Sequence, residues 1–211
     1  MNFRRHFRNW ARLLPQKLWT DERASQIVEF ALSLPLLVFF VIGIFDFSSA
    51  ISLKQKLTNA AREAARIAAA DPANDLGAPS LPVPVSVRDA LQVVDNYLLS
   101  EKLNDCLLST APPTGGGELT WSFNAQNNGC GSPGVTLTVN RGYFFPQGAT
   151  ASGSSSCTSS QPAAGQIAVI GTCVILQYPY TWQFGSVSGL FGGHFLGPTV
   201  ITATAVAFNE N

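Results

Sequence analysis

The chain has 211 residues, a formal net charge of zero and 46% hydrophobic residues, so it can supply one modest folded domain together with a membrane helix. The charge is unevenly distributed. Residues 1–24 hold six basic and two acidic side chains, whereas the remainder holds seven basic and eleven acidic ones. Because the basic excess is confined to residues 1–24, the composition gives no support for a nucleic-acid-binding surface.

Residues 1–24 read as a basic leader. Phe3, Phe7, Trp10 and Leu14 recur at helical spacing among arginines. This pattern suits either an amphipathic helix lying on an anionic membrane surface or a disordered leader. The positive-inside rule places the leader in the cytoplasm and everything after the membrane helix on the other side.

A long helix is predicted from an N-cap at Thr20 to about residue 70. Its apolar part, Ile27–Phe47, spans roughly 31 Å, and a bilayer core is roughly 30 Å thick. The apolar core of a cleaved secretory signal is shorter, about 7–15 residues, so the pattern favours a retained anchor over such a signal. Pro35 lies inside the apolar part and predicts a kink.

Glu29 places a carboxylate inside this apolar run. Ile27 and Val28 precede it, and no charged side chain follows between Phe30 and Phe45. A charge near hydrocarbon is costly unless it is paired or reaches the interface. Glu29 is therefore expected either to pair with a positive group or to extend to the cytoplasmic surface.

The helix continues beyond the membrane as a segment of small side chains. In residues 51–70, one stripe is apolar and the charged residues lie mostly off it. The stripe is made of Leu53, Leu57, Ala61, Ala64 and Ala68. It permits close packing, either on the chain's own domain or on another subunit.

The remaining sequence predicts a proline-rich linker, 71–85, and an extracytoplasmic α+β domain, 86–211. Ser86 is the expected N-cap of a second helix over 87–104. An antiparallel sheet of about four strands, packed on the helices as in pilins, is then expected from alternating or β-prone stretches. These stretches are 118–123, 135–139, 166–180 and 199–208. The segment 184–194 reads as a short helix or a turn.

All four cysteines follow the membrane helix. An even number in an exported segment indicates two disulfides, although four free thiols remain an alternative. The favoured pairing is sequential because each pair brackets one long polar loop. The pairs are Cys106 with Cys130 and Cys157 with Cys173.

No pattern in the chain indicates catalysis. The two histidines, His6 and His194, stand in the leader and in a glycine-rich segment, away from any nucleophile motif. No C-x-x-C occurs, and the sparse carboxylates after the helix suggest no acid–base pair. We therefore expect a protein without enzymatic activity, metal or cofactor.

Residues 22–70 contain V-E-F-A, L-P-L-L, G-I-F-D-F and A-A-R-E-A-A-R. Residues 174–208 contain V-I-L-Q-Y-P-Y and I-T-A-T-A-V. Both stretches resemble the TadE-like family, minor pilins of the tight-adherence (Tad) pilus system, and the second is similar to the strands that close the sheet in this family. The basic leader and a glutamate five residues after a small side chain also look like the processing site of pilins.

The resemblance implies cleavage by a prepilin peptidase between Ala24 and Ser25, although glycine is more usual at the position of Ala24. The freed amine of Ser25 would then be a partner for Glu29 of a neighbouring subunit. The implied role is a minor pilin or pseudopilin that assembles with other pilus subunits and an inner-membrane platform. It would lie in the bacterial inner membrane with its C-terminal domain periplasmic or extracellular. The alternative is an unprocessed, membrane-anchored binding module.

Overall fold

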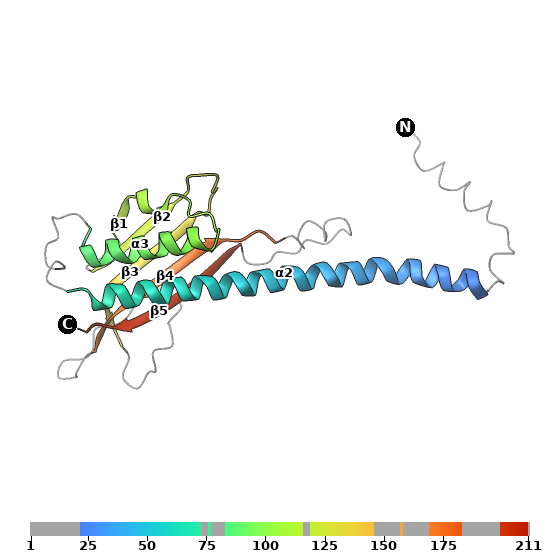
Figure 1. Cartoon of the computed structure of the whole chain (residues 1–211), viewed down its shortest axis with the longest axis horizontal. Coiled ribbons are helices and arrows are strands. Elements are labelled where there is room, and N and C mark those ends of the chain that lie inside the picture. Colours follow the sequence, from blue (N-terminus) through green and yellow to red (C-terminus); the bar gives the residue numbers. More distant parts are fainter. Residues whose placement is uncertain are drawn as a thin grey trace. The chain divides into compact units, whose positions relative to one another are not determined.

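A computed structural model of the chain describes residues 22–72, 76, 83–115, 119–145, 157, 169–182 and 199–210 (Figure 1). Contacts divide the chain into two compact units, residues 1–47 with 183–194 and residues 48–182 with 195–211. The predicted leader helix, the Thr20 cap, most of the linker, the segment 184–194 and both histidines lie outside the described residues. These expectations, and the domain boundaries at 24, 70 and 85, stay predictions.

The first described element is helix α2, Glu22–Ala70, which confirms the long helix expected from the sequence. It is continuous through Pro35. The kink expected at Pro35 stays a prediction. At its far end the N–H of Asp71 donates to the carbonyl of Ile67, and Pro72 follows. Proline at this place cannot continue the helical hydrogen bonding.

The second unit begins with the last part of α2, whose predicted stripe is buried. Leu57, Ala61, Ala64 and Ala68 have no exposed surface, and Leu53 is 8% exposed. All five belong to one hydrophobic cluster with α3 and the sheet. Of the two interpretations that the sequence left open, packing of this stripe on the chain's own domain is the one observed.

Helix α3, Val85–Ser100, differs from the prediction at both ends. The predicted cap Ser86 lies within the first turn with its hydroxyl buried, and Pro84 occupies the cap position. The carbonyl of Pro84 accepts hydrogen bonds from the N–H groups of Val87 and Arg88. Proline suits the start of a helix because its missing N–H would have no partner there.

The C-terminal end of α3 is earlier than residue 104 because the chain turns there. Lys102 adopts a left-handed conformation with φ of 58°. The N–H of Lys102 donates to the carbonyl of Leu99, and that of Leu103 donates to the carbonyl of Leu98. These two bonds form a Schellman motif, a turn in which glycine is more common than lysine.

One antiparallel sheet has the strand order β1-β2-β3-β4-β5, so each strand pairs with the next along the chain. About four strands were predicted, and the sheet has five within the described part of the chain. The additional one is the three-residue edge strand β1. The bounds are Pro113–Gly115 for β1, Thr120–Ala125 for β2, Val135–Phe144 for β3, Ile170–Pro179 for β4 and Val200–Phe208 for β5.

The core of the second unit lies between the helices and one face of the sheet (Figure 1). Leu137, Val139, Val174 and Leu176 on the central strands are fully buried and face the helices' small side chains. The opposite face carries a second, smaller cluster of Tyr143, Cys157 and Cys173. The predicted α+β class is therefore confirmed, with a long apolar helix, a second helix and an antiparallel sheet.

Candidate functional site

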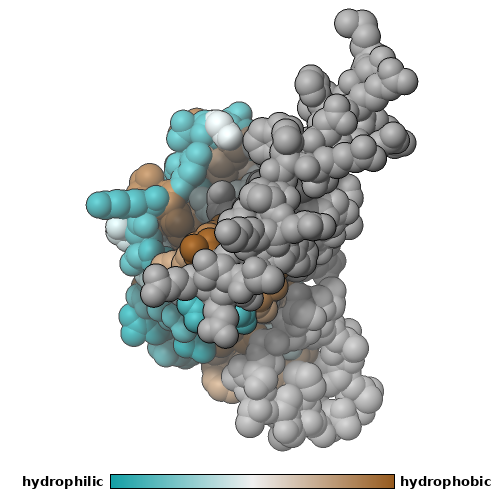
Figure 2. All heavy atoms as spheres, turned by 90° about the vertical axis from the view of Figure 1, so that its right-hand side faces the viewer, coloured by the Kyte–Doolittle hydropathy of each residue, from teal (hydrophilic) through white to brown (hydrophobic). Residues whose placement is uncertain are grey.

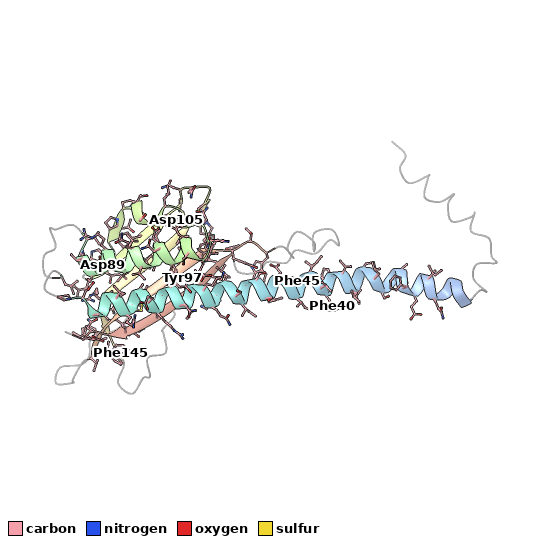
Figure 3. All side chains as sticks on the ribbon, in the orientation of Figure 1. Phe40, Phe45, Asp89, Tyr97, Asp105 and Phe145 are labelled. Carbon is pink, nitrogen blue, oxygen red and sulfur yellow. A yellow bond between two sulfur atoms is a disulfide. The ribbon has the colours of Figure 1, made fainter. Side chains whose placement is uncertain are left out.

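The apolar part of α2 is the most distinctive surface of the molecule. Among the described residues, one helix is long and apolar enough to cross a membrane, and it lies within Gln26–Ala70. Its large side chains are exposed; Leu32 is 74% and Phe40 61% exposed. Figure 3 shows Phe40 and Phe45 projecting outward from the helix. Apolar side chains that point away from protein on a helix of this length fit a lipid environment.

Glu29 lies on this surface as the sequence indicated. Its side chain is exposed, one helical turn after Ser25. Both sides of the predicted cut, Ala24 and Ser25, fall within the first turn of α2, which begins at Glu22. The cut site and the carboxylate are therefore carried by one end of the same helix.

Asp46 is a buried carboxylate of α2 that the sequence analysis did not single out. It is 4% exposed, whereas its neighbours Phe45 and Phe47 are 70% and 54% exposed. It precedes Ala50 by four residues and Leu53 by seven, the spacing of one helix face. This spacing was the sequence signal that could have found Asp46, because it places Asp46 on the same face of α2 as the buried stripe.

Both disulfides have the sequential pairing favoured from the sequence. Cys106 is bonded to Cys130 and Cys157 to Cys173, each with Cα atoms 5.6 Å apart. The first joins the turn after α3 to the connection between β2 and β3. The second fixes residue 157 to β4, where the side-chain amide of Asn140 also donates to the Cys157 carbonyl at 2.8 Å.

Beside the first disulfide lies a buried pair of carboxyl groups, which sequence reasoning also missed. Asp95 and Asp105 are 8% and 6% exposed. Burial, and then the charge of Asp105, raise the pKa of Asp95, against hydrogen bonds from Ser109 that lower it. Burial and Asp105 likewise raise the pKa of Tyr178, whose hydroxyl accepts the N–H of Asn104 at 3.1 Å.

These two aspartates stand on α3 and on the turn that follows it, ten residues apart. Helical spacing does not bring such positions together. The reversal at Lys102 does so, and nothing in the sequence marks that reversal. Because the two carboxyl groups repel each other when both are ionised, protonation of one favours the folded arrangement.

A buried arginine holds the far end of α2. Arg141 on β3 is 1% exposed and donates to the carbonyl of Asp71 at 3.0 Å and to the hydroxyl of Thr172 at 3.4 Å. That hydroxyl donates to the side chain of Asn209 at 2.7 Å. The last turn of α2 has no basic residue, so this guanidinium supplies the positive charge that a helix C-terminus favours.

No group of three or more His, Cys, Asp or Glu side chains in the described part of the chain could hold a metal ion. The candidate site in the first unit consists of the exposed apolar part of α2, with the Glu29 carboxylate near its start. Figure 2 shows hydrophobic residues gathered in the middle of one face, with hydrophilic residues beside them.

Comparison with known proteins gives one match. Residues 24–66 match the family model described as TadE-like protein. The searches against curated proteins and against solved structures give no match. The matched segment includes the predicted cut site, Glu29, Pro35, Asp46 and most of the buried stripe. Residues 24–66, which lie within α2, are therefore similar to TadE-like proteins.

Proposed function

We propose that the chain is a minor pilin or pseudopilin that takes part in assembling a Tad-type adhesion pilus, without catalytic activity. The observation that carries the proposal is the extent of the TadE-like match. It begins at Ala24, the residue before the predicted cut, and continues to Arg66, through the membrane segment and the stripe that packs on the sheet. The match therefore covers the helix on which such a subunit depends.

In this proposal the leader is removed before assembly. A prepilin peptidase cuts between Ala24 and Ser25 on the cytoplasmic side of the bacterial inner membrane. The domain after α2 lies outside the cytoplasm. Two disulfides support this placement, because such bonds persist mainly in oxidising compartments.

Glu29 then has a role in recognition between subunits. Cleavage creates a positive amine on Ser25, and helices packed side by side place amines and carboxylates in a medium of low dielectric constant. Opposite charges attract strongly there. We propose that Glu29 pairs with the amine of a neighbouring subunit, while in an isolated subunit its exposed side chain can reach the interface.

Expression of the full chain with and without a Tad-system prepilin peptidase tests the proposal. We expect the peptidase to remove residues 1–24, seen as a faster-migrating product whose first residue is Ser25 by mass spectrometry. Ala24→Phe is the control and should stay uncut, because the pocket for that position accepts small side chains. An unchanged wild-type product would favour the unprocessed, membrane-anchored binding module.

A further inference from the structure

A hollow of about 460 Å³ lies in the second unit directly after the apolar segment of α2. We call it the serine hollow. It is lined by Ser48, Ser49, Ser52 and Lys56 of α2, by Leu103 after α3 and by Tyr180 after β4. Ser48 immediately follows Phe47, the last residue of the apolar run. The hollow therefore begins where the helix leaves the hydrocarbon.

The position of the hollow along α2 matches the lipid headgroup layer. That layer occupies roughly 5–7 Å on each side of the hydrocarbon core. Ser48 to Ser52 covers about 6 Å of helix, so these hydroxyl groups fall within the layer. Lys56 lies about one turn farther, but helical side chains lean toward the helix N-terminus and lysine has a long stem.

Two aromatic side chains beside the hollow also favour a position at the level of the lipid headgroups. Tyr180 and Trp182 follow β4 and form an edge-to-face pair with centroids 5.0 Å apart. Both are partly buried against the core of the second unit. Tyrosine and tryptophan are enriched at membrane–water interfaces, because each combines an apolar ring with a polar group.

The charge in the hollow comes from Lys56. Its ammonium lies 3.0 Å from the carboxylate of Glu101, and both side chains are about one-third exposed, at 37% and 35%. An ammonium has three donors and the ion pair uses one of them. Lys56 and the hydroxyl groups of Ser48 and Ser52 can therefore donate together to a phosphate.

We propose that the serine hollow binds the phosphate headgroup of a phospholipid in the extracytoplasmic leaflet. The inference rests on the membrane anchoring in the proposed function and adds a ligand to it. The bound lipid fixes the second unit at the membrane surface before the subunit enters a filament. Leaving the bilayer then requires release of this headgroup.

The depth of Trp182 gives the first test. The full chain, with Trp10, Trp19 and Trp121 replaced by Phe, is reconstituted in phosphatidylcholine–phosphatidylglycerol vesicles. Nitroxide-labelled headgroups should quench Trp182 at least about twofold more than nitroxides deep in the acyl chains, as expected for an interfacial aromatic. Stronger quenching from the acyl chains, or none from either label, would overturn the proposal.

The second test measures how much lipid the chain retains and uses the natural tryptophans. It can therefore be done even if the variant with three Trp→Phe substitutions does not fold. After detergent extraction, native mass spectrometry should show phosphatidylglycerol occupancy reduced about fivefold in Lys56→Gln. The matched control is Lys54→Gln, which removes the same charge outside the hollow and should leave the occupancy within twofold of wild type. Equal losses in both variants would contradict a specific site.

Glu101→Gln separates lipid binding from the ion pair. It removes the same pair but leaves Lys56 free for phosphate, so lipid occupancy should stay equal or rise. A loss like that of Lys56→Gln would mean that the ion pair only supports the fold, which overturns the proposal.

Carbonate extraction separates failure of this inference from failure of the anchoring. A chain released from membranes at alkaline pH would contradict both. A chain that stays in the membrane but retains no phosphatidylglycerol, or whose Trp182 is quenched more strongly from the acyl chains than from the headgroups, contradicts the headgroup site alone.

Discussion

The two halves of α2 belong to one continuous helix and have opposite surroundings. From Ile27 to Phe47 the large apolar side chains are mostly exposed, whereas from Ala50 to Ala69 the apolar side chains are small and mostly buried. The first half leaves its apolar side chains exposed, whereas the second half packs its apolar side chains against α3 and the sheet. Both halves of α2 are rich in apolar residues, so the two halves differ in whether those side chains are buried within the protein and not in whether they are apolar.

The largest expected effect comes from a matched pair of leucine substitutions. Leu57 is fully buried and Leu36 is 61% exposed. Leu57→Ala should lower the free energy of unfolding by about 2–5 kcal/mol, because it leaves a cavity in the core. Leu36→Ala should change it by less than about 0.5 kcal/mol. Urea titration of the full chain in detergent micelles, followed by near-ultraviolet circular dichroism, measures both. Equal losses would remove the distinction between the halves.

The disulfides are the next largest effect and act on the second unit alone. Replacing Cys106 and Cys130 together by Ser should lower the free energy of unfolding by about 3 kcal/mol in the chain-entropy model. The bond closes a loop with a sequence separation of 24. The same urea titration measures the loss, and insertion of the anchor should not change. Non-reduced peptide mapping of exported protein checks the pairing, and free thiols or crossed peptides would contradict it.

Glu29→Ala tests the proposed role of the carboxylate in the first half of α2. Removing this charge should favour membrane insertion by up to roughly 2–3 kcal/mol, while pilus output falls because the pairing with Ser25 is lost. Insertion is measured by a glycosylation or protease-protection assay, and output by shearing and immunoblotting. Glu22→Ala is the control, since the peptidase would remove residue 22. Normal output from Glu29→Ala would support the interpretation in which Glu29 only reaches the interface.

The smallest effect is a pH dependence of the second unit. Because the pKa of Asp95 is raised in the folded state, its contribution to stability is complete below 3.8, its ordinary value, and is lost as the pH rises through the raised pKa. The groups facing it are Asp105, Ser109 and, through Asp105, Tyr178. Asp95→Asn should flatten this part of the stability–pH curve relative to wild type. Parallel curves for the two proteins would contradict the coupling.

Elements marked by a regular spacing of apolar residues could be predicted from the sequence, whereas turns that reverse the chain could not. The alanine stripe and the alternating strands follow from the spacing of apolar residues, whereas the sequential cysteine pairing was only favoured because each pair brackets one long polar loop. The end of α3 was predicted too late because its turn uses Lys102, where the usual glycine signal is missing. Strand β1 was missed because Pro113–Gly115 is short and contains residues that are rare in strands.

Buried charge was the other part of the site that spacing could not reveal. The predicted strand stopped at residue 139, yet β3 continues to Phe144 and buries the side chain of Arg141. Its burial depends on carbonyl and hydroxyl partners from Asp71 and Thr172, which are distant in the chain. Such partners become neighbours only through the tertiary fold.

Because β5 is the last strand along the chain, the core over the alanine stripe is completed late in synthesis. Ala203 and Ala205 complete the core over the alanine stripe, and the N–H of Glu210 donates to the carbonyl of Ala69. Chains are synthesised from the N-terminus, so α2 is complete about 130 residues before the strand that finishes covering it. At about 5–20 residues per second, the alanine stripe stays partly uncovered for many seconds during synthesis. During that interval its small apolar side chains can still pack against the wrong neighbours.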